Sequence, residues 1–270
     1  MIYASRQYLI RDYQKFCRYR VNCKKSGILD LSGETFLFPT TLLPLMAFIV
    51  NENVPVIPPE DPNVTNYLLT VTNSSRFELA QRFKKSYLPL VQLPRERKEA
   101  NKILQRIYEM HNDGRDCGGE NAFKYLIGEI VDNIYEHSEF ETSWVMAQAY
   151  GSMGFMDICF FDDGITINGC FKKHGMGFKN DCQAIVEAIN GASTKGDQRG
   201  FGLNTTMRIF THGIKGQMLI VSGRGCVMFS KTKQQPYDLG KAYQLEGTLV
   251  SVRIPYPSPE VDIYAYLEGN

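Results

Sequence analysis

The stretch that decides the fold is Phe123-Lys-Tyr-Leu-Ile-Gly-Glu-Ile-Val-Asp-Asn-Ile-Tyr-Glu-His-Ser138. Its apolar residues recur at helical spacing and form one stripe: Phe123, Leu126, Ile127, Ile130, Val131 and Ile134. Glu129, Asn133 and His137 follow at intervals of four, and because four residues turn a helix by roughly 400°, their side chains point nearly the same way. The pattern predicts an amphipathic helix with a polar row at the rim of its buried face. Such a row can line a pocket, or it can be an ordinary solvated surface.

The composition is that of an ordinary globular protein. A chain of 270 residues can form one large domain or two smaller ones. The net charge of +1 gives no basic surplus that would favour nucleic acid or an anionic membrane as a partner. We find no apolar run long enough for a signal peptide or a membrane span, so we expect a cytoplasmic protein. The seven scattered cysteines contain no CxxC pair, which indicates reduced thiols.

The first part of the chain predicts alternating helices and strands. Helices are expected over residues 7–23, 42–50, 73–83 and 95–111, and strands over 28–32 and 67–72. The segment 88–94 contains two prolines and is expected to be a connector. This order predicts a small α/β domain over residues 1–92, followed by a second domain over 93–270.

The second part predicts mainly strands. A hairpin is expected from 144–150 and 155–161, helices over 182–189 and 203–211, and closing strands over 217–222, 226–231 and 248–255. Three short motifs lie at the ends of these elements: Asp162-Asp-Gly-Ile-Thr166, Gly200-Phe-Gly-Leu203 and Gly247-Thr248. Each alone is common in turns. Their order and setting carry more information than any one of them.

With these motifs in this order, residues from about 121 to 255 resemble the ATP-binding domain of the GHKL superfamily, which includes gyrase, histidine kinases, anti-sigma-factor serine kinases and MutL. Glu129 to Asn133, followed by His137-Ser138, resembles the N box. Asp162-Asp-Gly164 resembles the first glycine box and Arg199-Gly-Phe-Gly-Leu203 the second. Gly247-Thr248 resembles the terminal Gly-Thr element.

The resemblance implies an α/β (α+β) fold, a two-layer sandwich with a mixed, mostly antiparallel sheet, and it implies ATP or ADP with Mg²⁺ as ligands. Asn133 would ligate Mg²⁺, Glu129 would act as base, and Asp162 would accept the adenine amino group. Gly164 would let the backbone approach the nucleotide, while Gly200 and Gly202 would cradle phosphates. The remaining positions implied to line the site are His137, Thr166, Thr194, Lys195, Arg199, Leu203 and Thr248. A hydrogen-bonded boundary position explains His137 equally well.

In this family the segment from Thr166 to Gly200 covers the nucleotide. Its glycines and cations, Lys172 and Lys173 among them, are suited to a closing lid, although lysine-rich loops are usually only solvated. Thr166 stands where the family usually has the second glycine of the first box, and it could stiffen the hinge.

The departures from the family select one branch. We find no phosphoacceptor-histidine hairpin and no transducer domain after Pro255, so the pattern favours the stand-alone anti-sigma-kinase type. Such a protein phosphorylates serine or threonine on a small partner or binds it. Two alternatives stay open: a non-catalytic, nucleotide-dependent interaction module, or a slow ATPase whose nucleotide state controls homodimerisation.

The segment Ile28-Leu-Asp-Leu-Ser-Gly-Glu-Thr-Phe36, followed by Thr40-Thr41, resembles the strand-turn-helix of STAS domains, the class that such kinases act upon. The resemblance implies a partner of STAS type, and it makes Ser32, Thr40 and Thr41 candidate phosphoacceptors. The plainer interpretation is that they are turn and cap residues.

Overall fold

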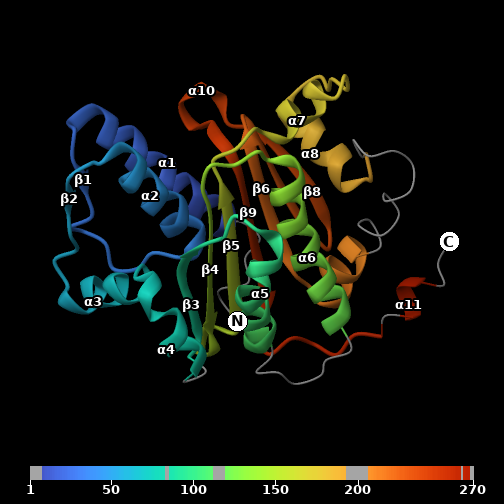
Figure 1. The fold of residues 1–270 in the computed structure, drawn as a ribbon, viewed down its shortest axis with the longest axis horizontal. Coiled ribbons are helices and arrows are strands. Elements are labelled where there is room, and N and C mark those ends of the chain that lie inside the picture. Colours follow the sequence, from blue (N-terminus) through green and yellow to red (C-terminus); the bar gives the residue numbers. More distant parts are fainter. Residues whose placement is uncertain (1–7, 83–84, 112–118, 193–205, 263, 268–270) are drawn as a thin grey trace.

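The computed structural model describes residues 8–82, 85–111, 119–192, 206–262 and 264–267. A seven-stranded sheet lies at its centre, with strand order β3-β4-β5-β9-β6-β7-β8 (Figure 1). Its strands are β3 (Tyr87–Gln92), β4 (Ser143–Tyr150), β5 (Phe155–Asp162), β6 (Gln217–Gly223), β7 (Gly225–Ser230), β8 (Lys233–Asp238) and β9 (Leu245–Pro255). The α/β class is confirmed. The main sheet, however, is antiparallel throughout instead of mixed, and parallel pairing joins only the short β1 (Leu29–Asp30) and β2 (Val56–Ile57) within the described residues.

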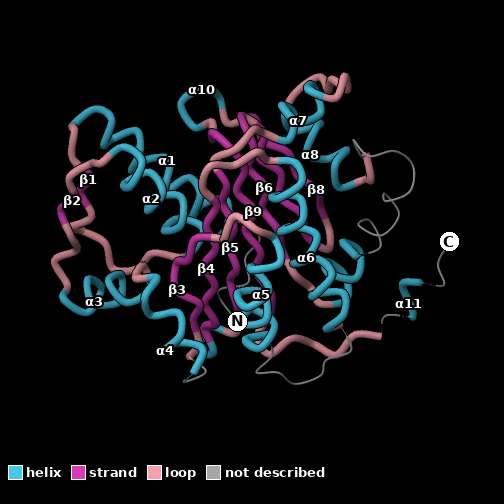
Figure 2. The backbone as a smooth tube through the Cα atoms, in the orientation of Figure 1, coloured by secondary structure: helices cyan, strands magenta, loops and turns pink. Residues whose placement is uncertain are grey.

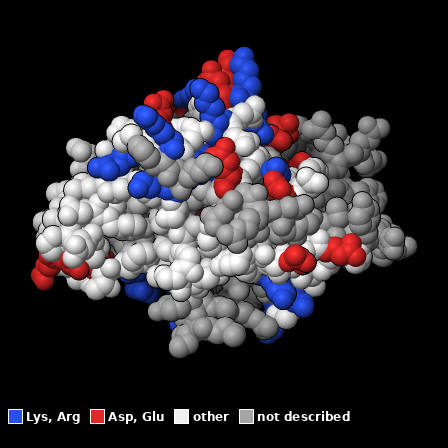
Figure 3. All heavy atoms as spheres, turned by 90° about the horizontal axis from the view of Figure 1, so that it is seen from below, with Lys and Arg blue, Asp and Glu red and all other residues white. Residues whose placement is uncertain are grey.

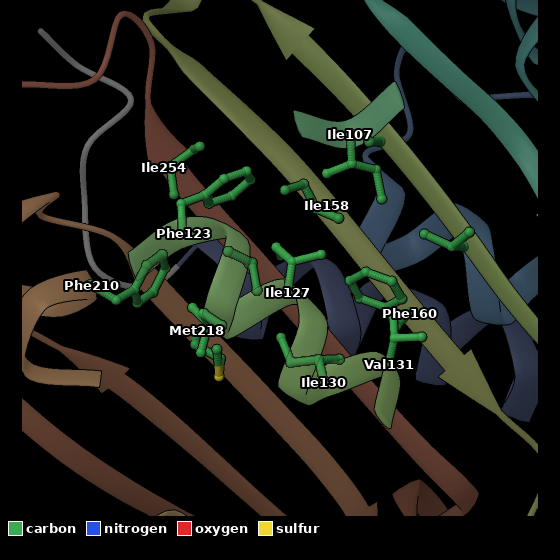
Figure 4. Close-up of a cluster of buried hydrophobic side chains, with 14 of the residues drawn as sticks. Ile107, Phe123, Ile127, Ile130, Val131, Ile158, Phe160, Phe210, Met218 and Ile254 are labelled. Atoms are coloured by element: carbon green, nitrogen blue, oxygen red, sulfur yellow. The ribbon is translucent and has the colours of Figure 1, made fainter. Parts of the chain in front are cut away.

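One face of the sheet is covered by α5 (Asn101–Met110), α6 (Glu120–His137), α7 (Ile167–Lys173) and α8 (Asp181–Ile189). The predicted amphipathic helix is confirmed as α6. Figure 4 shows Phe123, Ile127 and Val131 of its apolar stripe packed among side chains of the sheet. The polar row lies beside this stripe, where Asn133 is exposed and Glu129 and His137 are half-buried.

The other face of the sheet is covered by α1 (Tyr8–Ser26) and α2 (Pro39–Glu52). Successive strand residues therefore enter two different cores: Ile158 and Phe160 point toward α6, while Cys159 and Phe161 point toward α1 and α2. Figure 2 shows the strands gathered in the middle with helices around them. The described part thus has three layers. The resemblance implies two layers for residues 93–270 and a small α/β domain before them; in the structure α1 and α2 of that first segment form the third layer on the main sheet.

The remaining elements border these layers. They are α3 (Pro62–Val71), α4 (Phe77–Arg82), α10 (Gly240–Tyr243), α11 (Tyr264–Leu267), 3₁₀ helices at Ser74–Arg76, Arg97–Ala100 and Gly151–Met153, and a π-helix at Ile209–Gly213. The predicted strand over 67–72 is wrong, because this segment belongs to α3. Asp61 caps that helix by accepting a hydrogen bond from the Asn63 N–H (2.8 Å), and Pro62 occupies its first position.

Two further strands differ from the prediction. The expected connector over 88–94 contains β3, an edge strand that pairs with β4 and tolerates a proline there. The polar strand β8 was not predicted, and it pairs with β7 at the other edge. Because β3 lies within residues 1–92, that segment contributes both a helical layer and an edge strand to the main sheet. Its resemblance to STAS domains stays a prediction.

Thr40 and Thr41 are not accessible as phosphoacceptors. Both are buried in α2: the Thr40 hydroxyl lies 2.5 Å from that of Ser251, and the Thr41 hydroxyl donates to the Asp12 carbonyl at 2.8 Å. Ser32 is half-buried in the turn after β1, where its N–H bonds the Asp30 carboxylate (2.9 Å). The first two candidates are therefore wrong, and Ser32 stays a prediction.

Acidic and basic side chains lie among one another on the face shown in Figure 3, in keeping with a net charge of +1. Within the described ranges, no helix combines the length and the apolar character needed to cross a membrane.

A charged cluster is buried between the sheet and α1. Arg253 of β9 donates two hydrogen bonds of 2.6 Å to Asp157 of β5, and its Nη2 lies 3.5 Å from Asp12 of α1. One guanidinium thus faces two carboxylates in a site closed to water, with the rings of Phe38 and Phe155 beside it. Asp12 Oδ2 has no hydrogen-bond partner, and burial raises the pKa of the Asp12 carboxyl to about 7.

Substituting Asp12→Asn should change how stability depends on pH. The folded-state pKa of about 7 exceeds the ordinary value of 3.8, so between these values the folded chain keeps a proton that the unfolded chain has lost. The free energy of unfolding should therefore fall as pH rises from about 4 to about 7. Asp12→Asn should flatten part of this fall and stabilise the protein at about pH 8, as measured by urea unfolding across this range.

Glu78→Gln, a change of an exposed carboxylate on α4, serves as the control and should leave the profile unaltered. A profile of Asp12→Asn that falls as steeply as that of the wild type would show that Asp12 does not titrate in this range.

Candidate functional site

A row of small polar side chains crosses four strands at one end of the sheet. Direct neighbours in this polar row are Ser143, Asp162, Thr248 and Ser222, from β4, β5, β9 and β6. The row two residues further into the sheet on the same face is apolar: Val145, Phe160, Val250 and Ile220. The hydrophobic core under α6 therefore ends at the polar row, where the strands can present hydrogen-bonding groups to a ligand.

Asp162 is the charged member of the polar row, and it is only 2% exposed. Its Oδ1 accepts a hydrogen bond from the Gly164 N–H at 3.1 Å. Burial raises the pKa of this carboxyl to about 7, while hydrogen bonds from Gly164, Ser138 and Thr248 oppose the shift. A buried carboxyl poised near neutrality is typical of a functional site, although structural networks produce it too.

The neighbouring Asp163 has a different role. Its carboxylate accepts hydrogen bonds from the N–H groups of Glu141 (2.9 Å) and Thr142 (2.8 Å) and from the Thr142 hydroxyl (2.6 Å). It therefore fixes the loop between α6 and β4. Of the two acids in the Asp-Asp-Gly motif, Asp163 thus bonds this loop, whereas Asp162 belongs to the polar row.

The end of α6 is joined to the loop after β5. The Ile165 N–H donates to the Ser138 carbonyl at 2.6 Å, and a Cβ on Gly164 would overlap that same carbonyl oxygen. The sequence predicts that Gly164 allows close approach to a nucleotide; the structure adds that it allows close approach to α6. This contact brings the C-terminal end of α6, at Ser138, next to Asp162.

The Gly247-Thr248 motif lies in a bulge of β9. Thr248 pairs with Ser222, but the next pair is Leu245 with Gly223, so Glu246 and Gly247 have no partners of their own. Gly247 has φ +83°, and a Cβ there would overlap the Asp162 carbonyl oxygen. Only glycine fits both constraints. Thr248 itself lies in the regular ladder beside Asp162, and the bulge begins directly before it and packs Gly247 against the Asp162 backbone.

Ser222 belongs to this site, and the sequence reasoning missed it. Its hydroxyl lies 3.0 Å from that of Thr248 and accepts from the Ile167 N–H at 2.9 Å. It therefore joins β6, β9 and the start of α7. The signal was available, because a serine that ends an apolar strand in the same alternation as Ile220 faces the α6 side.

Where the structure describes it, the predicted lid consists of the helices α7 and α8 with a loop between them. At the predicted hinge position, the Thr166 side chain caps α7 by accepting a hydrogen bond from the Gly169 N–H (3.0 Å). Asn168 of α7 bonds Asp181 of α8 at 2.8 Å, and Asp181 also accepts from the Arg224 N–H (2.8 Å). Six predicted site residues lie outside the described residues: Thr194, Lys195, Arg199, Gly200, Gly202 and Leu203.

The three residues of the predicted polar row all lie on α6. Glu129 is half-buried, Asn133 is exposed, and the His137 ring lies 3.9 Å from the Glu136 carboxylate. Among the described residues, no group of three or more His, Cys, Asp and Glu side chains is arranged to hold a metal ion.

The chain matches no protein-family model, and no curated protein matches it in sequence.

Substituting Gly164→Ala should destabilise the protein, because the new methyl group would overlap the Ser138 backbone. We expect a loss of about 1–3 kcal/mol, the usual cost of overpacking, measured by urea unfolding. Gly128→Ala is the matched control: it lies inside α6 with open space around its Cβ position, so it should stabilise by about 0.8–1 kcal/mol. Equal effects of the two substitutions would contradict the close approach.

Proposed function

We propose that this chain binds Mg²⁺-ATP between α6 and the polar row, and that it acts as a serine/threonine kinase-like switch on a protein partner. The observation that supports this best is Asp162, a buried carboxyl held by three surrounding elements at the edge of the core. The GHKL resemblance of the motifs around it supplies the ligand class.

The chemistry of Asp162 favours adenine. The 6-amino group of adenine donates a hydrogen bond, whereas guanine has a carbonyl oxygen at that position, which would face the ionised form of Asp162 with a second acceptor. A buried acceptor that is left without a donor costs about 1–3 kcal/mol. Thr248 and Ser222 extend the row beside it with hydroxyl groups that can bond the base directly or through water.

The row on α6 suits the phosphate end of the ligand. The amide oxygen of Asn133 is a hard ligand of the kind that Mg²⁺ accepts, and the side chain is exposed. Bound Mg²⁺ would bridge phosphate oxygens and neutralise their charge. Glu129 lies one helical turn earlier, where a half-buried carboxylate can orient or deprotonate an attacking hydroxyl group.

Asn133→Ala should abolish the magnesium-dependent part of ATP binding. We would measure the Kd for ATP by isothermal titration with and without Mg²⁺, and the loss should disappear when Mg²⁺ is left out. Asn121→Ala is the matched control, because it removes the same exposed amide from the first turn of the same helix. A folded wild type that binds no ATP, or an Asn133→Ala variant that binds like the wild type, would overturn the proposal.

Glu129→Gln tests the catalytic part separately. If Glu129 is the base, turnover should fall by about 10²- to 10⁴-fold, while the Kd for ATP stays within about threefold of the wild-type value. ADP formation, measured with and without a serine-containing partner, gives the rate. Tight ATP binding by a wild type that forms no ADP would exclude the kinase and favour an interaction module whose nucleotide sets only its conformation.

A further inference from the structure

Helix α1 holds the segment that precedes the β9 bulge, and it does so from the face of the sheet opposite α6. The Tyr13 hydroxyl donates to the Tyr243 carbonyl at 2.9 Å. Arg20 Nη2 donates to the Gln244 carbonyl at 2.7 Å and to the Ala242 carbonyl at 3.3 Å. Two side chains of one helix thus fix the carbonyl groups of consecutive residues at the entry to β9.

Both donors are themselves held in place. Tyr13 is fully buried, and burial raises the pKa of its hydroxyl, which therefore stays a donor at neutral pH. The Arg20 guanidinium lies 5.1 Å from the centre of the Phe16 ring. Leu245, the next residue of the gripped segment, is buried in the core formed with α1 and α2. The Tyr13 contact is therefore part of the packed interior, whereas Arg20 is half-buried.

The gripped segment leads straight into the candidate site. The bulge residues Glu246 and Gly247 follow Leu245, and Gly247 lies so close to the Asp162 carbonyl that no side-chain atom fits between them. Gly247 therefore has no room to move toward Asp162. A shift of the Gln244 carbonyl must either displace Gly247 or change the backbone conformation of the bulge. Bulges are the part of a sheet where such adjustments occur.

We propose that Tyr13 and Arg20 are positioning residues for the nucleotide pocket: they set the β9 bulge, and through it they hold Gly247 against the backbone of Asp162. This inference rests on the proposed function, since it assumes that the Asp162 pocket receives adenine. It gives the N-terminal layer a role in nucleotide selection without any contact with the nucleotide. Loss of the grip should weaken the adenine contacts and leave the phosphate contacts of α6 intact.

The test compares Tyr13→Phe, Arg20→Ala and the double variant with the wild type. Isothermal titration gives the Kd for ATP and for GTP, and a thermal melt reports folding. The double variant should bind ATP about tenfold more weakly, as expected for the loss of about 1.4 kcal/mol, while its affinity for GTP changes little. The ATP-to-GTP preference should therefore shrink by a similar factor.

Two further variants separate positioning from general destabilisation. Arg18→Ala removes an exposed cation from the same helix and should leave both affinities unchanged. Arg20→Lys keeps one donor and should recover part of the ATP affinity. Variants that melt earlier but keep the wild-type preference for ATP would overturn the inference and make the grip a structural anchor only. A wild type that does not bind ATP would instead overturn the proposed function, and this inference with it.

Discussion

The structure depends on a central sheet whose middle strands are buried on both faces. Every residue of β5, from Phe155 to Asp162, is buried, because α5 and α6 cover one face and α1 and α2 the other. In such a strand a polar side chain needs a partner or a place at the end of the core. Asp157 has the partner, Arg253 on the adjacent strand. Asp162 lies at the end of the core, and the candidate site is therefore at this end of the sheet.

The helix α6 and the β4–β5 hairpin could be predicted, because both show strong periodic patterns in the sequence. The segments whose secondary structure was predicted wrongly have weaker sequence patterns. Residues 67–72 have the β-branched content of a strand, but the cap at Asp61 and Pro62 begins a helix that runs through them. Strand β8 consists mostly of polar residues, since it is exposed at an edge and held by backbone pairing to β7. Nothing in its side chains marks it as a strand.

Most residues of the candidate site could be predicted from the sequence, but the contacts that hold them together could not. Asp162, Gly164 and Thr248 follow from the motifs, but which atoms the glycines approach depends on tertiary contacts. Gly164 approaches the end of α6, and Gly247 approaches β5. The alternation with Ile220 predicts which face of the sheet Ser222 lies on, but a single serine at the end of an apolar strand belongs to no motif that would mark it as part of a site. Its two hydrogen bonds become visible only when β6, β9 and α7 are brought together.

Strand β9 links the two faces of the protein. On the α6 side it presents Thr248 to the candidate site, and on the other side it presents Ser251 and Arg253 to the N-terminal helices. A layer that merely shielded the sheet would need only apolar contacts. This one closes a charged cluster around Arg253, bonds Ser251 through Thr40 and grips the entry to β9 through α1. Polar contacts of this kind have narrow geometric limits, so they fix the position of the N-terminal layer against β9 more closely than apolar packing alone would.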